Sequence, residues 1–528
     1  MDKGILKIER SKLYIIPLIL CAFMLVFFVS VYKYREGEIN YYNSDATWHT
    51  LLTIEAYREN PVSQHLFLPI VSLGDIDDKY IPWGATISDD EGNYYYTSFS
   101  SAGYFMPWLF MKIFKLPVTE RSLYIFNSLL FAISAALWGY FIYIVFVNKS
   151  IYSYILSGIG IITYVLSPEL LHGMGIVYWH QSIMQVTLLI QIIAYYKMCE
   201  SDSKYAKPIF YLMAFVNPYI EWTGYVANVG FALAELITFW KQKRLAFRKI
   251  FIIGILTVFS GGLFIVHYLL HADASRFFEI AKNRFIDRSG SGIFTWTNVF
   301  GGYLNSFLYW WLLLLILIIW SFKKNDMVVF QHRMLLLVLA FPLVENIIMK
   351  GHACSYSYDR MKGIFVVSFV ICELSYHLLK SLSRAGISVL ITLLIIVGVM
   401  NLNSYIRNTS YIWEVNYRRD NQLLAEYISQ NYADSVLGTE PGVSVRGYIN
   451  LLFGRGVYEG RDAEKLKGIA AGKEKRYAIS ISAEYTGAWL WSLYDLGIVT
   501  IHDMQTGDVI QVECVDGNIY STVLQNYE

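Results

Sequence analysis

Charged residues are scarce in this chain. Asp, Glu, Lys and Arg make up 16% of its 528 residues, against about 25% in ordinary soluble domains. Hydrophobic residues make up 55%, and the mean hydropathy is +0.40. The few charges are clustered and leave apolar runs of about twenty residues, long enough to cross a hydrocarbon core about 30 Å thick. This composition excludes an ordinary soluble globular protein and indicates a polytopic α-helical membrane protein.

The low net charge and the spacing of the cysteines argue against two further classes of function. The formal net charge is only +1, whereas a nucleic-acid-binding domain carries a basic face, so no nucleic-acid partner is expected. The five cysteines show no C-x-x-C spacing, which argues against a thiolate zinc site. No residue is assigned as a metal ligand, and a requirement for a divalent metal is left open.

The apolar runs predict about eleven membrane-spanning helices. The first, residues 13–32, is too long for a signal-peptide core and lacks a small-x-small cleavage site, so we expect a retained helix. A basic segment precedes it, and the basic clusters at 241–249 and 323–324 fall on the same side in this count. The positive-inside rule then places the N-terminus in the cytoplasm and the C-terminus outside.

A long polar segment, residues 34–102, follows the first run and is expected outside the cytoplasm. The next apolar stretch, residues 103–116, is short and is expected to lie in the membrane interface. We therefore predict a transmembrane domain over 1–404 that includes a large first extracytoplasmic loop, residues 34–120.

The composition becomes soluble from about residue 403. Residues 418–432 predict an amphipathic helix, and residues 478–481 and 509–512 alternate like strands. The sequence of residues 515–518, Val-Asp-Gly-Asn, is typical of a hairpin turn. We predict a small extracytoplasmic α/β domain over 405–528.

Ionisable side chains gather where the predicted helices reach the outer side, rather than in mid-span. A proton or ion transporter is expected to carry charge near the midplane, whereas an enzyme acting at the outer surface on a lipid-borne substrate fits this distribution. The outer residues are Asp45, His49, His172, His180, Glu221, His352, Arg360 and Lys362, and the mid-span ones are Glu235, Glu345, Glu373, His267 and His377.

The layout resembles the GT-C glycosyltransferases, which include the protein O-mannosyltransferases and the bacterial aminoarabinose transferases. Their first outer loop carries an acidic pair, and Asp45 stands at that position here. The segment Tyr96-Thr97-Ser98-Phe99 precedes the predicted interfacial helix. Ser100-Ser101-Ala102-Gly103 follows it, where the family usually has two prolines. The C-terminal domain is also similar in placement to that of O-antigen-modifying glucosyltransferases.

This resemblance implies transfer of a single sugar, with glucose as one candidate, from a polyprenyl-phosphate donor with inversion at the anomeric carbon. It implies a glycan or lipid-linked glycan acceptor, such as the O-antigen of lipopolysaccharide. The expected partners are therefore the donor, the acceptor and the lipid bilayer, which the resemblance implies is a bacterial inner membrane.

Candidate roles follow from the chemistry of this reaction. A carboxylate can act as general base toward the acceptor hydroxyl, and Asp45 is the candidate. Cations stabilise the departing phosphate, and Arg360 and Lys362 are the candidates, with His352 and Tyr358 as hydrogen-bond donors. The candidates for sugar or acceptor binding are Trp48, His49, Tyr96, His180 and Glu221.

Structural alternatives accompany these roles. Asp45 could cap the helix that residues 46–57 predict, and Arg360 and Lys362 could anchor a helix end at lipid headgroups. Glu221 could pair with a loop cation, and the aromatic residues could form an interfacial belt.

Two alternative functions also stay open. One is an O-antigen polymerase or ligase, although such enzymes usually keep their main loop later in the chain. The other is a transporter or flippase of lipid-linked sugars.

Overall fold

The computed structural model describes residues 15–35, 44–73, 85–90, 92–146, 151–175, 177–201, 203–242, 247–290, 295–323, 332–381, 383–408, 411–439, 445–459, 462–473, 475, 477–485 and 495–526. The chain divides into two compact units. The first comprises Met1–Arg35, Tyr124–Phe264 and Ile286–Thr409. The second comprises Glu36–Leu123, Ile265–Phe285 and Ser410–Glu528. The domain boundary predicted at residue 404 stays a prediction.

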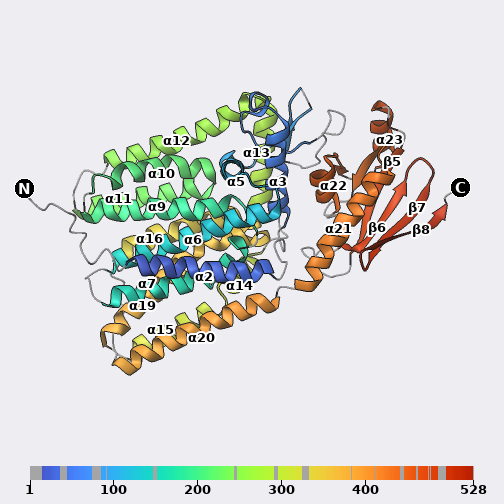
Figure 1. Cartoon of the computed structure of the whole chain (residues 1–528). Coiled ribbons are helices and arrows are strands. Elements are labelled where there is room, and N and C mark those ends of the chain that lie inside the picture. Colours follow the sequence, from blue (N-terminus) through green and yellow to red (C-terminus); the bar gives the residue numbers. More distant parts are fainter. Residues whose placement is uncertain are drawn as a thin grey trace, which may run out of the picture. The chain divides into compact units, whose positions relative to one another are not determined.

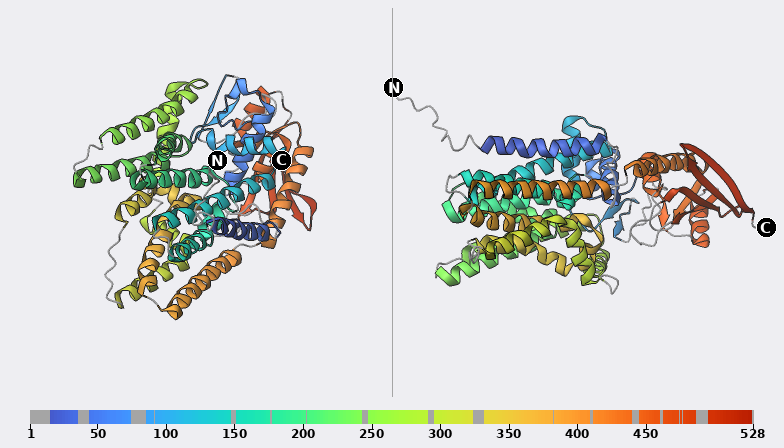
Figure 2. Two further views of the ribbon diagram at one scale, coloured as in Figure 1. Left: turned by 60° about the vertical axis from the view of Figure 1, so that its left-hand side comes forward. Right: turned by 90° about the horizontal axis from the view of Figure 1, so that it is seen from below.

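The first unit is a helix bundle whose long helices run alongside one another (Figures 1 and 2). Its α-helices, two of which extend a few residues into the second unit, are α2 (Ile15–Arg35), α6 (Glu120–Val145), α7 (Ile151–Val165), α8 (Pro168–Gly173), α9 (His180–Ser201), α10 (Ala206–Ile220), α11 (Thr223–Gln242), α12 (Phe247–Leu269), α14 (Trp296–Phe307), α15 (Tyr309–Lys323), α16 (Arg333–Ala340), α17 (Val344–Ile348), α18 (Lys350–Ser355), α19 (Ile364–Ser381) and α20 (Arg384–Asn408). Two 3₁₀ helices, η2 (Phe341–Leu343) and η3 (Ser357–Gly363), interrupt this series.

Several helices have the length and composition of membrane spans. Among the described residues five qualify, and a sixth is added if α14 and α15, bent by 83°, form one broken span. This is consistent with the predicted polytopic helical fold, while the predicted count of about eleven stays a prediction. One predicted span, residues 335–349, is divided into α16, η2 and α17. Pro342 lies at that division, and proline removes a backbone donor from the helical ladder.

The bundle core is aromatic and closely packed. Trp138 of α6 is fully buried, and its Nε1 donates to Ser368 Oγ at 2.9 Å. Its ring lies 5.3 Å from that of Phe365, centroid to centroid. A Cβ on Gly139 would lie 2.6 Å from Ile161 Cδ1. Small residues at such contacts let membrane helices approach closely.

The second unit contains the first loop, which is folded. Its elements before residue 124 are α3 (Ser44–Glu59), α4 (Val62–His65), β1 (Thr86–Ser88), β2 (Tyr94–Tyr96) and α5 (Ala102–Phe114). Strands β1 and β2 are antiparallel, with Ile87 opposite Tyr95. Helix α5 confirms a helix close to residues 103–116, and its interfacial position stays a prediction. A further helix, α13 (Ala274–Ser289), runs across the boundary between the two units.

The C-terminal part of this unit is a mixed six-stranded sheet in the order β4-β3-β5-β6-β7-β8. The β3–β4 and β3–β5 pairs are parallel and the other pairs are antiparallel. The elements are α21 (Tyr411–Asn431), β3 (Ser435–Thr439), α22 (Val445–Phe453), β4 (Tyr458–Glu459), α23 (Ala463–Gly472), β5 (Tyr477–Tyr485), β6 (Asp495–Asp503), β7 (Asp508–Val515) and β8 (Asn518–Asn526). Helix α21 and strands β5 and β7 confirm the elements predicted there.

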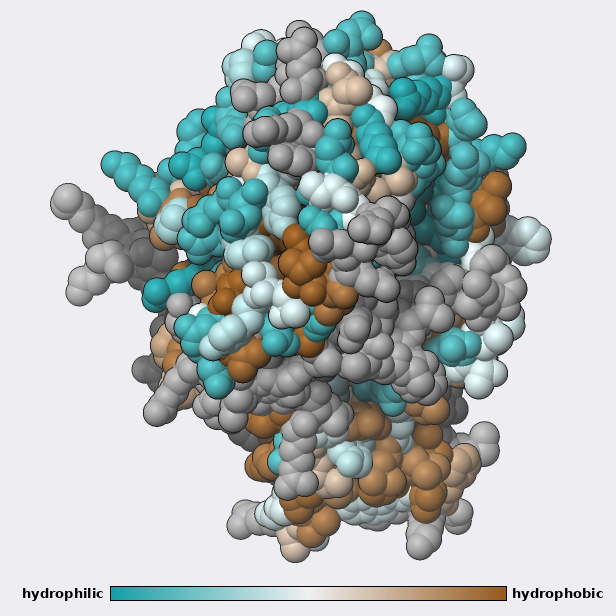
Figure 3. Space-filling view, turned by 90° about the vertical axis from the view of Figure 1, so that its right-hand side faces the viewer, coloured by the Kyte–Doolittle hydropathy of each residue, from teal (hydrophilic) through white to brown (hydrophobic). Residues whose placement is uncertain are grey.

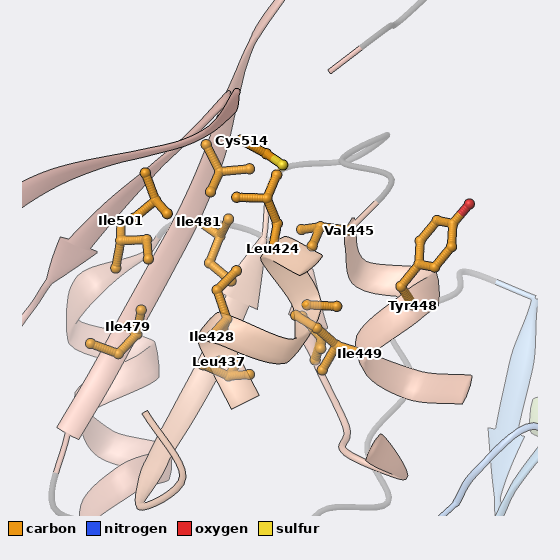
Figure 4. Close-up of a cluster of buried hydrophobic side chains, with 14 residues drawn as sticks. Leu424, Ile428, Leu437, Val445, Tyr448, Ile449, Ile479, Ile481, Ile501 and Cys514 are labelled. Atoms are coloured by element: carbon orange, nitrogen blue, oxygen red, sulfur yellow. The ribbon is translucent and has the colours of Figure 1, made fainter. Parts of the chain in front are cut away.

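Adjacent strand residues point to opposite faces of the sheet, and this divides the domain into three layers. Ile479 of β5 packs with Leu424 and Ile428 of α21, as Figure 4 shows. The preceding residue, Ala478, packs with Leu466 of α23 in a second cluster. The sheet therefore lies between α21 and α22 on one face and α23 on the other.

The predicted hairpin turn is confirmed between β7 and β8. Asp516 and Gly517 have positive φ angles of 49° and 80°. Two central residues with positive φ are typical of a type I′ turn, whose twist matches that of the flanking strands.

Figure 3 shows the chain from another side. Hydrophilic side chains dominate the upper part of that face, and hydrophobic side chains gather mainly toward its lower edge.

Candidate functional site

A buried group of charged side chains lies within the helix bundle of the first unit. Glu221, Glu345 and Asp359 each expose 3% or less of their surface. One ligand oxygen from each lies within 4.8 Å of the others. We call these three residues the carboxylate cluster. Lys362 lies among them, 5% exposed.

The junction between α10 and α11 places Glu221. Helix α10 ends at Ile220, and Glu221 is extended, with φ −161° and ψ 155°. The Glu221 carboxylate accepts the backbone N–H of Thr223 at 2.8 Å, at the first residue of α11. A Cβ on Gly224 would lie 2.2 Å from the carbonyl carbon of Asn217. Only glycine therefore fits where the two helices approach.

The 3₁₀ helix η3 places Asp359 and Lys362 side by side. Residues three apart eclipse one another in a 3₁₀ helix. Lys362 Nζ accordingly lies 3.3 Å from Asp359 Oδ1 and donates to Glu345 Oε2 at 2.6 Å. It also donates to Thr223 Oγ1 at 3.1 Å, and that hydroxyl donates to Glu345.

Gln181 connects two of the carboxylates from the first turn of α9. Its Nε2 lies 3.4 Å from Glu221 Oε1 and 3.5 Å from Asp359 Oδ1. A small pocket opens beside this contact. It is lined by Gln181, Met184, Gln185, Leu188, Thr223, Tyr358, Asp359 and Lys362.

The charges of this site do not balance within the described residues. The three carboxylates carry three negative charges when ionised, and Lys362 carries one positive charge. His352 lies close by, its Nδ1 3.4 Å from Asp359 Oδ2. Burial lowers the pKa of His352 below its ordinary value, so the imidazole is neutral near pH 7. The site therefore holds an excess of negative charge unless protons or a cation offset it.

Arg360 makes a separate set of contacts. Its Nε donates to Ser306 Oγ at 2.9 Å and one terminal nitrogen donates to the Ala353 carbonyl at 2.7 Å. The other terminal nitrogen lies 3.6 Å from Glu169 Oε1. Burial raises the pKa of Glu169, and the positive charge of Arg360 opposes this rise. The two predicted phosphate-binding cations are thus each paired with protein carboxylates.

The remaining predicted residues of this unit lie near Asp359. Tyr358 is buried and lines the pocket, and its ring stacks on Tyr356 at 5.3 Å between centroids. His180 is fully buried at the start of α9, directly before Gln181, with its ring 4.8 Å from that of Trp179. The structure therefore brings Lys362, His352, Tyr358 and Glu221 into one neighbourhood.

The predicted residues of the first loop lie in the second unit. The His49 ring is in T-shaped contact with Tyr96, at 4.4 Å between centroids, and its Nε2 lies 3.2 Å from the Tyr104 hydroxyl. The Trp48 ring lies 4.3 Å from that of Tyr448 in α22. Asp45 is the second residue of α3, which begins at Ser44, and its side chain lies outside the described part of the chain.

Sequence reasoning omitted two members of the carboxylate cluster. Glu345 stands inside a predicted span, and an ionisable residue within a membrane segment is itself a sign of a functional site. Asp359 directly precedes Arg360, which the sequence predicts as a phosphate-binding residue. Their proximity to Glu221 depends on the tertiary fold, because no local spacing connects α10, α17 and η3.

The fold has a counterpart among solved structures. The chain matches a crystal structure of ArnT from Cupriavidus metallidurans bound to undecaprenyl phosphate, with a TM-score of 0.54 and 11% sequence identity. The match covers 89% of this chain and 93% of ArnT. No family model and no curated protein matches the chain. At this identity the likeness shows the fold alone, and this chain therefore has a helical fold similar to that of ArnT.

Proposed function

We propose that this protein is a membrane glycosyltransferase of the GT-C type that uses a polyprenyl-phosphate-linked sugar. The observation that carries the proposal is the fold shared with ArnT, whose structure holds undecaprenyl phosphate, over nearly the full length of both chains. The outer-side distribution of ionisable residues in the sequence supports the same reading.

The proposed reaction transfers one sugar to an extracytoplasmic acceptor such as the O-antigen. An acceptor hydroxyl attacks the anomeric carbon while the bond from that carbon to the phosphate oxygen breaks. The hydroxyl proton passes to the Asp45 carboxylate, and the polyprenyl phosphate leaves with the bonding electrons. Attack from the face opposite the phosphate inverts the anomeric configuration.

The residues proposed to bind the donor phosphate are Lys362, Arg360, His352 and Tyr358. Cations placed where negative charge develops lower the barrier. Since Lys362 is within ion-pair distance of Glu345 and Asp359, phosphate binding there requires that protons or a bound cation offset these carboxylates. For the sugar or acceptor, the proposed contacts are Trp48, His49, Tyr96, His180 and Glu221.

The test uses the full chain in proteoliposomes with a panel of undecaprenyl-phosphate-linked sugars and an O-antigen acceptor. Loss of a general base costs about 10²- to 10⁴-fold in rate, so Asp45→Asn should lower transfer by at least about 100-fold. Asp90→Asn changes an exposed acid of the same loop and should leave transfer unchanged.

Three results would count against this proposal. Normal transfer by a well-folded Asp45→Asn variant would remove Asp45 from the mechanism. Transbilayer movement of the donor without sugar transfer would favour a flippase. Products extended by many sugars in one event would favour a polymerase or ligase.

A further inference from the structure

The carboxylate cluster has too little positive charge around it. Glu221, Glu345 and Asp359 are each at least 97% buried, and an isolated ionised carboxylate is costly to bury. Within the described residues, Lys362 is the cation that contacts the cluster, within 3.3 Å of two of its members. If all three acids are ionised, two negative charges remain, which equals the charge of one divalent cation.

The cluster has the dimensions of a metal site. Oxygen ligands on opposite sides of Mg²⁺ or Ca²⁺ lie about 4–5 Å apart, since the metal–oxygen distances are about 2.0–2.6 Å. The three carboxylate oxygens lie within 4.8 Å of one another. Three acids from α17, η3 and the α10–α11 junction therefore converge closely enough to share one ion.

A second observation points to a ligand at this place. Gln181 and Gln185 are 4% and 3% exposed, and the Oε1 atom of each has no hydrogen-bond partner among the described residues. They stand four residues apart on α9, so they share one face of the helix. Both line the pocket that also contains Asp359 and Lys362. Two buried amide groups whose oxygens lack donors therefore line the pocket beside the acidic cluster.

The orientation of the Gln181 amide adds to this. Its Nε2 lies 3.4 and 3.5 Å from two carboxylates, which is long for a hydrogen bond from an amide nitrogen. The two ends of a glutamine amide exchange by a simple rotation. With a cation present, the same rotation would turn Oε1 toward the ion.

We propose that Glu221, Glu345 and Asp359 bind one divalent cation of the oxygen-preferring class, Mg²⁺, Mn²⁺ or Ca²⁺, with amide oxygen from Gln181 or Gln185. Carboxylate and amide oxygens are the ligands these hard cations prefer. The cluster contains neither histidine nor cysteine, which separates it from zinc and copper sites. Binding of the cation does not depend on the proposed sugar transfer.

The experiment titrates Mn²⁺ into the purified full chain, stripped of metal, in lipid nanodiscs. Free Mn²⁺ is followed by its paramagnetic resonance signal, and Mg²⁺ and Ca²⁺ are then added as competitors. The wild-type chain should bind one Mn²⁺ saturably, with release by Mg²⁺ or Ca²⁺. Glu221→Gln and Glu345→Gln should each weaken binding by at least about tenfold, as changes around metal sites commonly do.

The matched control is Glu373→Gln in α19. Glu373 is fully buried in the same unit and lies 2.9 Å from His332 Nδ1, outside the carboxylate cluster. Its substitution should leave the Mn²⁺ affinity within about twofold of wild type, well below the tenfold loss expected of a ligand. A loss of binding as large as that of Glu345→Gln would mean that general destabilisation causes it, and would overturn the assignment.

Lys362→Met separates a cation site from a plain ion-pair network. The ammonium group competes with a metal for Glu345 and Asp359, so its removal should tighten Mn²⁺ binding. If the cluster serves only to pair Lys362, this variant should bind no better than wild type.

Two results would overturn the proposal. The first is absence of saturable Mn²⁺ binding to the wild-type chain, a result that does not depend on the folding of any variant. The second is that Glu221→Gln and Glu345→Gln both bind like wild type.

Discussion

Lys362 is buried among acids that outnumber it. A buried ion pair contributes little net stability, because desolvation of both charges offsets their attraction. Removing one partner is costly, since it leaves an uncompensated charge in the interior. The pairs of Lys362 with Glu345 and Asp359 are therefore better explained by the chemistry they position than by the stability they add.

His65 shows how burial sets a protonation state in the second unit. Its side chain is fully buried, and Nδ1 accepts the Phe67 backbone N–H at 2.9 Å. Its Nε2 lies 3.3 Å from the Asn60 carbonyl, so it carries the proton of the neutral ring. These contacts hold a turn in which Leu66 and Phe67 have positive φ angles of 45° and 62°. A positively charged imidazole could not accept the bond from Phe67.

This residue predicts a pH dependence of stability. Desolvation lowers the pKa of His65 in the folded protein below the ordinary 6.5, so the unfolded state takes up its proton at a higher pH. The free energy of unfolding should therefore fall as the pH drops through about 6.5. Thermal unfolding of the nanodisc protein from pH 7.5 to 5.5 measures this effect.

His65→Asn supplies the comparison, because asparagine does not titrate in this range. The variant should be less stable at pH 7.5 and should lose less stability on acidification than wild type. His352 also has a lowered pKa and contributes to the pH dependence of both proteins. The contribution of His65 is therefore the difference between wild type and variant in how steeply stability falls with pH. Equal slopes would show that His65 does not contribute.

At the scale of elements, the junctions between helices position the site. The break at Pro342 separates α16 from α17, and the 3₁₀ helix η3 precedes α19. Glu345 lies on the short helix α17, directly after the break, and Asp359 lies in η3. Continuous helices would distribute their side chains at 3.6 residues per turn. The irregular segments instead turn both acids toward Lys362.

Gly224 gives this element a direct test. Alanine in an exposed helix is about 1 kcal/mol more favourable than glycine. At Gly224, however, the added Cβ would lie 2.2 Å from the Asn217 carbonyl carbon and 2.3 Å from Pro218 N, both backbone atoms. We expect Gly224→Ala to destabilise the protein by about 1–3 kcal/mol, measured by thermal unfolding in detergent.

The control is Gly262→Ala in α12, where the added Cβ has no atom within 4 Å. This variant should unfold at or slightly above the wild-type temperature. A neutral Gly224→Ala would mean that α10 and α11 do not meet as closely as described.

At the scale of the whole molecule, the second unit combines segments that are far apart in the sequence. The Trp48 ring of the first loop contacts Tyr448 of the C-terminal domain. The Tyr268 hydroxyl, after α12 has entered this unit, donates to the carbonyls of Tyr96 and Phe99 at 2.5 and 2.7 Å. The first loop is therefore held by side chains from both later segments of the unit.

The predicted orientation of the chain is testable with reporters. The prediction depends on basic side chains, because the positive-inside rule places them in the cytoplasm. Many of them lie outside the described residues, at positions 1–14, 243–246 and 324. Alkaline phosphatase, active only outside the cytoplasm, should be active when fused after residue 528 and inactive when fused after residue 243. Green fluorescent protein at the same two positions should give the reverse pattern. Phosphatase activity at residue 243 would contradict the predicted topology.

Local patterns were enough to predict much of the architecture. The apolar runs indicate membrane helices because length and hydropathy are properties of one segment. The alternation in β5 and β7 and the Asp516–Gly517 turn are likewise local, since a strand face and a tight turn depend on neighbouring residues. The division of the span at residues 335–349 was missed, although Pro342 was a signal for it.

The carboxylate cluster could be identified only from the tertiary structure. Gln181 and Asp359 are 178 residues apart, and Thr223 and Glu345 are 122 apart. No periodicity within one segment connects them, because their distances depend on how helices cross and where they break. Composition alone was enough to predict a helical membrane protein. Only the packing of α9, α10, α17 and η3 decided which of its few buried charges would meet, since a charge inside the bundle is stabilised by neighbours that the fold supplies.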